Sequence, residues 1–122
     1  MKTLTLAEEE VMRILWQLKK AFVKDIIAEM TEPVPAYNTI STVIRILEKK
    51  EVVGYKVYGN THQYFPLISE EEYKRQEMKQ MMASYFDNSL PNMVSFLVKD
   101  NDLKVSDLDE LMKLIKDHKS KK

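Results

Sequence analysis

Residues 36–50 of this chain read AYNTISTVIRILEKK, and GYKVYGNTHQYFPL follows at residues 54–67; together these two segments are the most informative about its fold. In the first part apolar side chains recur at i, i+3, i+4 and i+7, which places them on one face of an α-helix directed at a core. They are Ile40, Val43, Ile44 and Leu47. The opposite face carries short hydroxyl and amide side chains and one long cation, Arg45. Such side chains can approach base edges and phosphates, so the pattern predicts a DNA-recognition helix.

The second part predicts a β-hairpin. Val53, Tyr55 and Val57 alternate with other residues, and residues 61–65 form a second β-prone run. Gly59-Asn60 stands between the runs as a two-residue turn, in which glycine supplies the positive φ. A polar-faced helix followed by a small basic hairpin indicates a winged helix-turn-helix. Most polar faces of this kind belong to solvated surface helices, so the helix alone favours that interpretation, whereas the hairpin and the preceding helices favour DNA contact.

Composition limits the functions open to the chain. Its 122 residues allow one modest core, or one small domain with an appended helical arm. Cysteine is absent, which excludes disulfides, thiolate metal sites and cysteine nucleophiles. No apolar run approaches the roughly 20 residues that cross a bilayer, and Met1 leads into no signal-peptide core, so we expect a cytoplasmic protein. The net charge is zero, so DNA affinity should require two subunits on one duplex.

Helical patterns precede the hairpin. Thr5 and Glu8 form a capping box, and an apolar stripe then predicts a helix over residues 6–19. A second, short helix is expected over residues 23–30, where two prolines end it. With the recognition helix and the hairpin, the predicted fold is mainly α with a small β-hairpin wing. We assign the winged helix-turn-helix domain to residues 1–68.

Residues 69–122 predict three further amphipathic helices that form a helical dimerisation region. Ser69 and Glu72 open the first, Asn88-Ser89 precede the second, and Ser106 caps the third. Their apolar stripes have no large core to cover, so a two-fold homodimer is expected. A bundle packed on the wing domain of the same chain is the alternative. The side chains assigned to the dimer are Met78, Met81, Met82, Tyr85, Leu90, Met93, Val94, Leu97, Leu108, Leu111, Met112 and Ile115.

The sequence offers little for catalysis or cofactor binding. His62 and His118 are the only histidines, and neither lies in a metal-ligand spacing. The two glycines lie in no phosphate-binding loop. We therefore expect no enzyme activity, no metal and no cofactor. His62 is interpreted as a residue of the wing, and His118 as part of the last helical end.

LTLAEEEVMRILW at residues 4–16 and AYNTISTVIRILEKKEVVGYKVYGNTHQYFPLISEEE at residues 36–72 resemble the penicillinase-repressor family of bacterial transcriptional regulators, the BlaI/MecI/CopY type. The most specific patterns are A-E-x-x-V-M-x-x-x-W in the first helix, A-Y-x-T-x-x-T-x-x-R-x-L in the recognition helix, and Y-x-P after the wing. The resemblance covers nearly the whole chain. It implies a homodimeric repressor that occupies a palindromic operator and blocks transcription of antibiotic-resistance genes.

The resemblance also implies roles for individual residues. Five residues of the recognition helix would face the major groove, and four others would approach the DNA backbone. The first group is Asn38, Thr39, Ser41, Thr42 and Arg45, and the second is Tyr37, Lys56, Tyr58 and Asn60. Trp16 is implied to be a packing residue, which its size also favours.

In the β-lactam branch of this family, a membrane-bound sensor metallopeptidase triggers cleavage of an Asn-Phe bond in the dimerisation region. The matching bond here is Ser95-Phe96, which keeps only the phenylalanine. Cutting there would divide the dimer seam and collapse affinity that depends on two linked half-sites. The copper-responsive branch uses cysteine ligands that this chain lacks. Two alternatives remain open: a winged-helix module that binds a protein, and a regulator that senses a small molecule between the wing domain and the helical arm.

Overall fold

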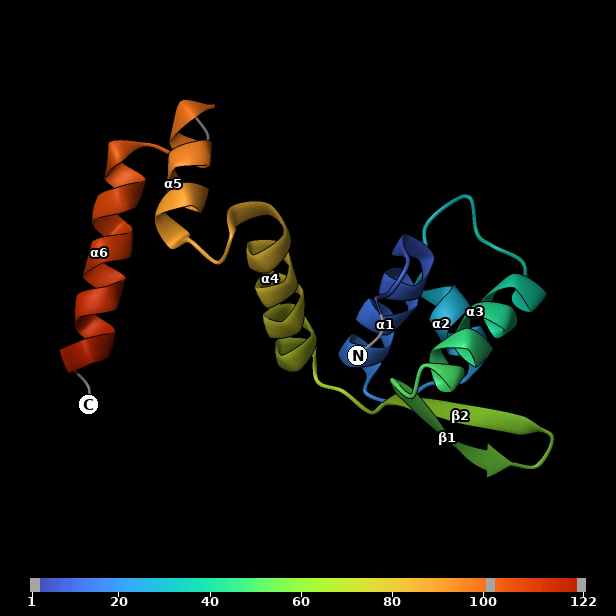
Figure 1. Ribbon diagram of the computed structural model, residues 1–122. Helices are drawn as coiled ribbons and strands as arrows, with labels where there is room; N and C mark the ends of the chain where they lie inside the picture. The colour runs from blue at the N-terminus through green and yellow to red at the C-terminus, as the bar shows by residue number, and fades with distance from the viewer. Residues whose placement is uncertain (1–2, 101–102, 121–122) are drawn as a thin grey trace. The chain divides into compact units, whose positions relative to one another are not determined.

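The computed structural model describes residues 3–100 and 103–120, which form six helices and one β-hairpin (Figure 1). In chain order the elements are α1 (Leu6–Leu18), α2 (Val23–Ala28), α3 (Tyr37–Lys49), β1 (Val53–Tyr58), β2 (Thr61–Pro66), α4 (Glu70–Phe86), α5 (Leu90–Lys99) and α6 (Val105–Ser120). The chain divides into two compact units, Met1–Lys74 and Arg75–Lys122. Among the described helices, none combines the length and the apolar character that a bilayer crossing requires.

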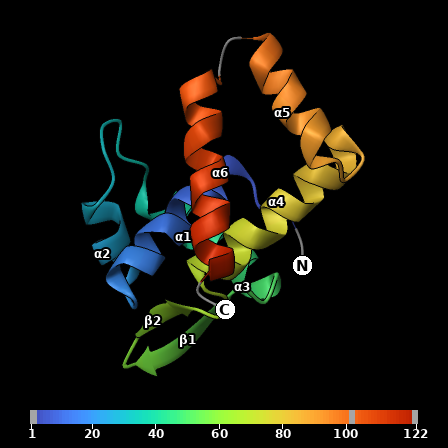
Figure 2. The same cartoon turned by 90° about the vertical axis from the view of Figure 1, so that its left-hand side faces the viewer.

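The first unit has one hydrophobic core, which the three N-terminal helices and the hairpin share. Figures 1 and 2 both show the hairpin below these helices. The stripes predicted for α1 and α3 supply much of the core: Val11 and Leu15 are fully buried in α1, and Ile44 and Leu47 in α3. Val53, the first residue of β1, and Val52 just before it are also buried in this core. The order helix, helix, helix, hairpin confirms the predicted winged helix-turn-helix.

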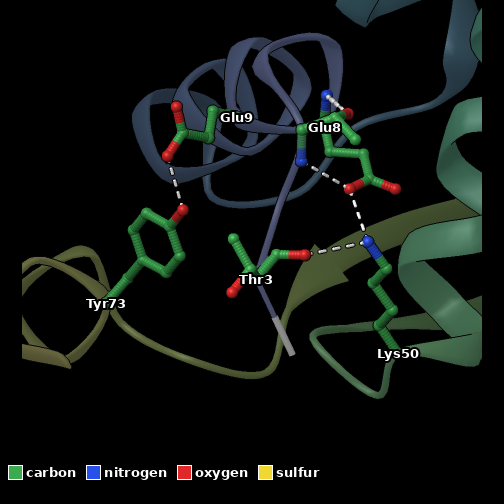
Figure 3. A network of polar contacts seen from close by, with 6 residues as sticks. Thr3, Glu8, Glu9, Lys50 and Tyr73 are labelled. Atoms are coloured by element: carbon green, nitrogen blue, oxygen red, sulfur yellow. Dashed lines mark hydrogen bonds and ion pairs between the residues drawn. The ribbon is translucent and has the colours of Figure 1, made fainter. Parts of the chain in front are cut away.

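The start of α1 is joined to the end of α3 by a buried carboxylate. The predicted capping box is present, since the Glu8 N–H donates to Thr5 Oγ1 at 3.2 Å and the Thr5 N–H donates to Glu8 Oε1 at 2.8 Å. The same oxygen accepts a hydrogen bond from Lys50 Nζ at 2.6 Å, and Lys50 also donates to the carbonyl of Thr3 (Figure 3). Burial acts to raise the pKa of Glu8, but the hydrogen bonds from Lys50 and Thr5 outweigh it and hold this pKa below its ordinary value.

The hairpin has the predicted turn. Its register pairs Val53 with Pro66 at one end and Tyr58 with Thr61 at the other, which leaves Gly59 and Asn60 as the two turn residues. Gly59 has a φ of 59°, the left-handed conformation for which glycine was expected.

The hairpin is also fastened to the helices. Between α1 and α2, the Ala21 N–H donates to the Tyr64 carbonyl at 2.9 Å, and the Tyr64 N–H donates to the Ala21 carbonyl at 2.7 Å. This isolated bridge fixes β2 beside the helix-turn-helix.

Three helix boundaries differ from the sequence prediction. Helix α1 ends at Leu18, one residue before the predicted end at Lys19. Helix α2 ends at Ala28, two residues early, and the Met30 N–H closes a turn onto the carbonyl of Ile27. Helix α6 begins at Val105, so Ser106 lies inside the helix and is not its cap. The reason is that the Asp107 carboxylate accepts the Lys104 N–H at 2.9 Å, which caps the helix two residues before Ser106. The cap predicted at Ser69 is confirmed, since its hydroxyl accepts the Glu72 N–H. The structure adds a cap at Ser89, whose hydroxyl accepts the Asn92 N–H.

Candidate nucleic-acid interface

The polar face of α3 is directed away from the core, as the apolar stripe on its other side requires. Of the six predicted contacts on this helix, five are exposed and Ser41 is half-buried. The exposed ones are Tyr37, Asn38, Thr39, Thr42 and Arg45. The Thr42 hydroxyl donates to the carbonyl of Asn38 at 2.9 Å. Because this bond uses the only hydroxyl proton of Thr42, the oxygen can still accept a hydrogen bond from a binding partner but cannot donate one.

A groove of about 470 Å³ lies between α3, the start of α2 and the hairpin. Four α3 residues line it at a spacing of i, i+4, i+8 and i+11, which is one stripe along a helix. They are Tyr37, Ser41, Arg45 and Glu48. The wing contributes Asn60, Thr61, His62 and Tyr64, and the start of α2 contributes Phe22, Val23 and Lys24. The groove therefore brings together four of the nine predicted contacts: Tyr37, Ser41, Arg45 and Asn60.

Lys56 and Tyr58, the other two predicted wing contacts, are exposed residues of β1. Lys56 Nζ lies 5.4 Å from the centroid of the Tyr58 ring, close enough for a cation–π contact. The Tyr58 ring also meets Phe22 edge-on at 5.9 Å, which connects the wing to the start of α2. His62 is confirmed as a wing residue, and its ring stacks on Tyr55 with centroids 4.4 Å apart.

The groove has mixed charge. Lys24 and Arg45 supply two cations, and Glu48 supplies a carboxylate on the same helical stripe as Arg45. Burial of Tyr64 raises the pKa of its phenol, and the nearby Glu48 carboxylate adds to this increase. The phenol therefore stays neutral and can donate a hydrogen bond. This combination suits selective contact with a polyanion better than uniform attraction to phosphate.

Sequence reasoning missed several residues of this groove. Glu48 could have been found, because it continues the helical period of Tyr37, Ser41 and Arg45. Phe22 and Lys24 could not, because only the packing of α2 against α3 and β2 brings them there. Trp16 is confirmed as a packing residue, and its Nε1–H also donates to the carbonyl of Ile68 at 2.8 Å, a bond that the sequence did not suggest.

The predicted dimer residues lie on α4, α5 and α6, where Tyr73 is the only buried side chain among the residues whose burial is described. Six of the twelve are exposed and six are half-buried. The exposed ones are Met78, Tyr85, Leu90, Leu111, Met112 and Ile115, and the half-buried ones are Met81, Met82, Met93, Val94, Leu97 and Leu108. Ser95 and Phe96 lie in the middle of α5, where the Phe96 ring meets Phe86 edge-on at 5.8 Å. In residues 3–100 and 103–120 no group of three His, Asp or Glu side chains could hold a metal ion.

The three-helix core, the wing and the outward polar helix define a winged helix-turn-helix protein. The sequence matches the penicillinase repressor family over residues 4–117, and the chain belongs to that family. It is 25% identical over 117 residues to the penicillinase repressor of Bacillus licheniformis, covering 95% of this chain and 91% of the relative. It is 29% identical over 110 residues to the methicillin resistance regulatory protein MecI of Staphylococcus aureus (strain N315), with 89% of each chain covered.

A solved structure supports the assignment of the fold. The DNA binding domain of the repressor BlaI matches with a TM-score of 0.51 and 28% sequence identity, covering 60% of this chain and 94% of that domain. A structure described as the CopR repressor matches with a TM-score of 0.47 and 30% identity, covering 56% of this chain and all of that one.

Proposed function

We propose that this member of the penicillinase repressor family is a homodimeric, sequence-specific DNA-binding transcriptional repressor. The observation that carries the proposal is the outward polar face of α3, which lies beside a groove that the wing closes. In this proposal Asn38, Thr39, Ser41, Thr42 and Arg45 read base edges in the major groove. Tyr37, Lys56, Tyr58 and Asn60 contact the backbone and set the register of α3 on the duplex.

The uncovered apolar faces of α4, α5 and α6 support a dimer. Burial of such side chains against a second copy stabilises by about 25 cal/mol for each Å² of apolar surface that leaves water. A two-fold dimer presents two copies of α3 to one duplex, so its operator is expected to be palindromic. The chain has no net charge, and a single unit should therefore bind DNA weakly.

A salt-dependent titration tests the proposal. The purified protein is titrated onto DNA from immediately upstream of its own gene, and onto a random duplex of equal length. Tight binding that favours the upstream fragment and falls steeply with salt is the expected result. Equal binding to both duplexes, or none at low salt, would contradict it and would favour a protein partner for the same surface.

Relief of repression by proteolysis is part of the proposal. Cleavage of the Ser95-Phe96 bond would separate α6 from α4 and remove part of the dimer seam. The bond lies inside α5, and proteases bind extended substrates, so local opening of this ten-residue helix must precede the cut. Mass spectrometry of the chain after induction is the direct measurement. DNA release from an intact chain would rule the cleavage out.

A further inference from the structure

Hydrogen bonds and an aromatic contact hold the first turn of α4, and Ile68 just before this helix, on α1. The Tyr73 hydroxyl donates to the carboxylate of Glu9 (Figure 3). The Tyr73 ring is buried and lies 5.6 Å from the ring of Trp16, centroid to centroid. Trp16 in turn donates through Nε1 to the carbonyl of Ile68. We call these four residues, Glu9, Trp16, Ile68 and Tyr73, the α4 clamp.

The clamp lies where a helix passes from one compact unit to the other. The first unit extends to Lys74, whereas α4 begins at Glu70 and continues to Phe86. The first turn of α4 therefore belongs to the unit that carries α3 and the wing. Apolar packing alone would let this turn shift on α1, but a tyrosine hydroxyl bound to a carboxylate and an indole N–H bound to a carbonyl each require one relative position.

We infer that the clamp fixes the origin of the helical arm on the DNA-binding unit, and that it thereby selects the spacing between the two half-sites that a dimer accepts. The inference rests on the proposed function. Two linked binding units gain affinity only where their linkage lets both reach DNA at once, and a fixed linkage concentrates that gain at one spacing. Glu9 and Tyr73 are thus positioning residues, which need not touch DNA.

Three variants test the inference: Glu9→Gln and Tyr73→Phe, each of which weakens or removes one clamp bond while keeping the shape of the side chain, and Glu10→Gln as control. Glu10 is the exposed neighbour of Glu9 on α1, so the control makes the same charge change outside the clamp. Each protein is titrated onto the upstream operator fragment, onto fragments with one or two base pairs inserted at its centre, and onto a single half-site. Acrylamide quenching of Trp16, the single tryptophan of the chain, reports whether the clamp has opened.

Glu9→Gln and Tyr73→Phe should keep the half-site affinity of the natural protein but lose about threefold or more of its preference for the native spacing, with more quenching of Trp16. Glu10→Gln should match the natural protein throughout. An unchanged spacing profile in both clamp variants would overturn the inference, and so would an equal loss on the half-site and on every spacing, which is the mark of a purely structural role. If the natural protein prefers its operator but tolerates all spacings, the inference alone fails. If it shows no preference for the operator, the proposed function fails too.

Discussion

At the scale of single residues, Arg45 and Lys56 are the two cations of the predicted interface. Arg45 lies on the exposed face of α3, where a planar guanidinium can bind a guanine edge through two hydrogen bonds. We expect Arg45→Ala to cost about 1–3 kcal/mol on operator DNA and little on random DNA. Lys56→Ala should weaken binding to both duplexes alike, because an ammonium is a point charge. Titrations of each variant onto the operator and the random duplex measure these two losses of affinity. Arg13→Ala on α1 is the control, because it removes one positive charge outside the predicted interface. Equal losses on both duplexes for Arg45→Ala would make it a phosphate contact.

Glu8 should make stability depend on pH. Its folded pKa lies below the ordinary value of 4.5, so its contribution is present above about pH 4.5 and is lost as the pH falls through the folded pKa. Glu8→Gln should lower the free energy of unfolding by about 1–2 kcal/mol at neutral pH, because Lys50 loses its ionised partner, while the glutamine can still accept the Thr5 N–H and Lys50 keeps its hydrogen bond to the Thr3 carbonyl. Urea unfolding at neutral and at acidic pH measures this, and the difference between variant and natural protein should shrink in acid. Glu10→Gln, on an exposed site, should show no such difference, and a pH-independent gap for Glu8→Gln would contradict the assignment.

At the scale of elements, the wing depends on the backbone of its turn. A side chain added at Gly59 would meet no atom within 4 Å, so any cost of substitution comes from the φ of 59° and not from a clash. Gly59→Val should destabilise by about 1–2 kcal/mol, because a branched side chain disfavours this conformation. Gly59→Asn should cost clearly less, since asparagine tolerates positive φ. Thermal unfolding of the two variants compares them, and equal losses would mean that the turn changes its conformation.

At the scale of the whole molecule, the apolar arm should control both assembly and DNA affinity. Leu111→Asp would bury a carboxylate in the proposed dimer seam, and it should convert the proposed dimer to monomers, with loss of operator binding. Leu114→Asp is the matched control, because Leu114 is exposed on the same helix but lies outside the predicted stripe. Sedimentation velocity gives the oligomeric state. A dimer that survives Leu111→Asp, or that both variants break equally, would remove the stripe as the interface.

The elements of this protein could be predicted because their signals are local. The apolar stripe of α3, the capping box at Thr5 and the glycine turn at Gly59 each lie within a few residues of the structure that they specify. The start of a helix is harder to predict where two neighbouring residues can each cap it. The last helix begins at Val105 because Asp107 binds the Lys104 N–H, and the serine one residue further on then has nothing to cap.

The fold class, the helix that carries the polar face and the resemblance to a repressor family all follow from the amino-acid sequence, because periodicity and motif spacing are properties of neighbouring residues. Three features required the folded chain: the set of side chains that share the groove, the pairing of Lys50 with Glu8 across 42 residues, and the bond of Tyr73 to Glu9 across 64. These contacts join elements whose relative positions come from burial of a common core. Hydrophobic burial is non-directional, so no local pattern in the chain records which polar groups it brings together.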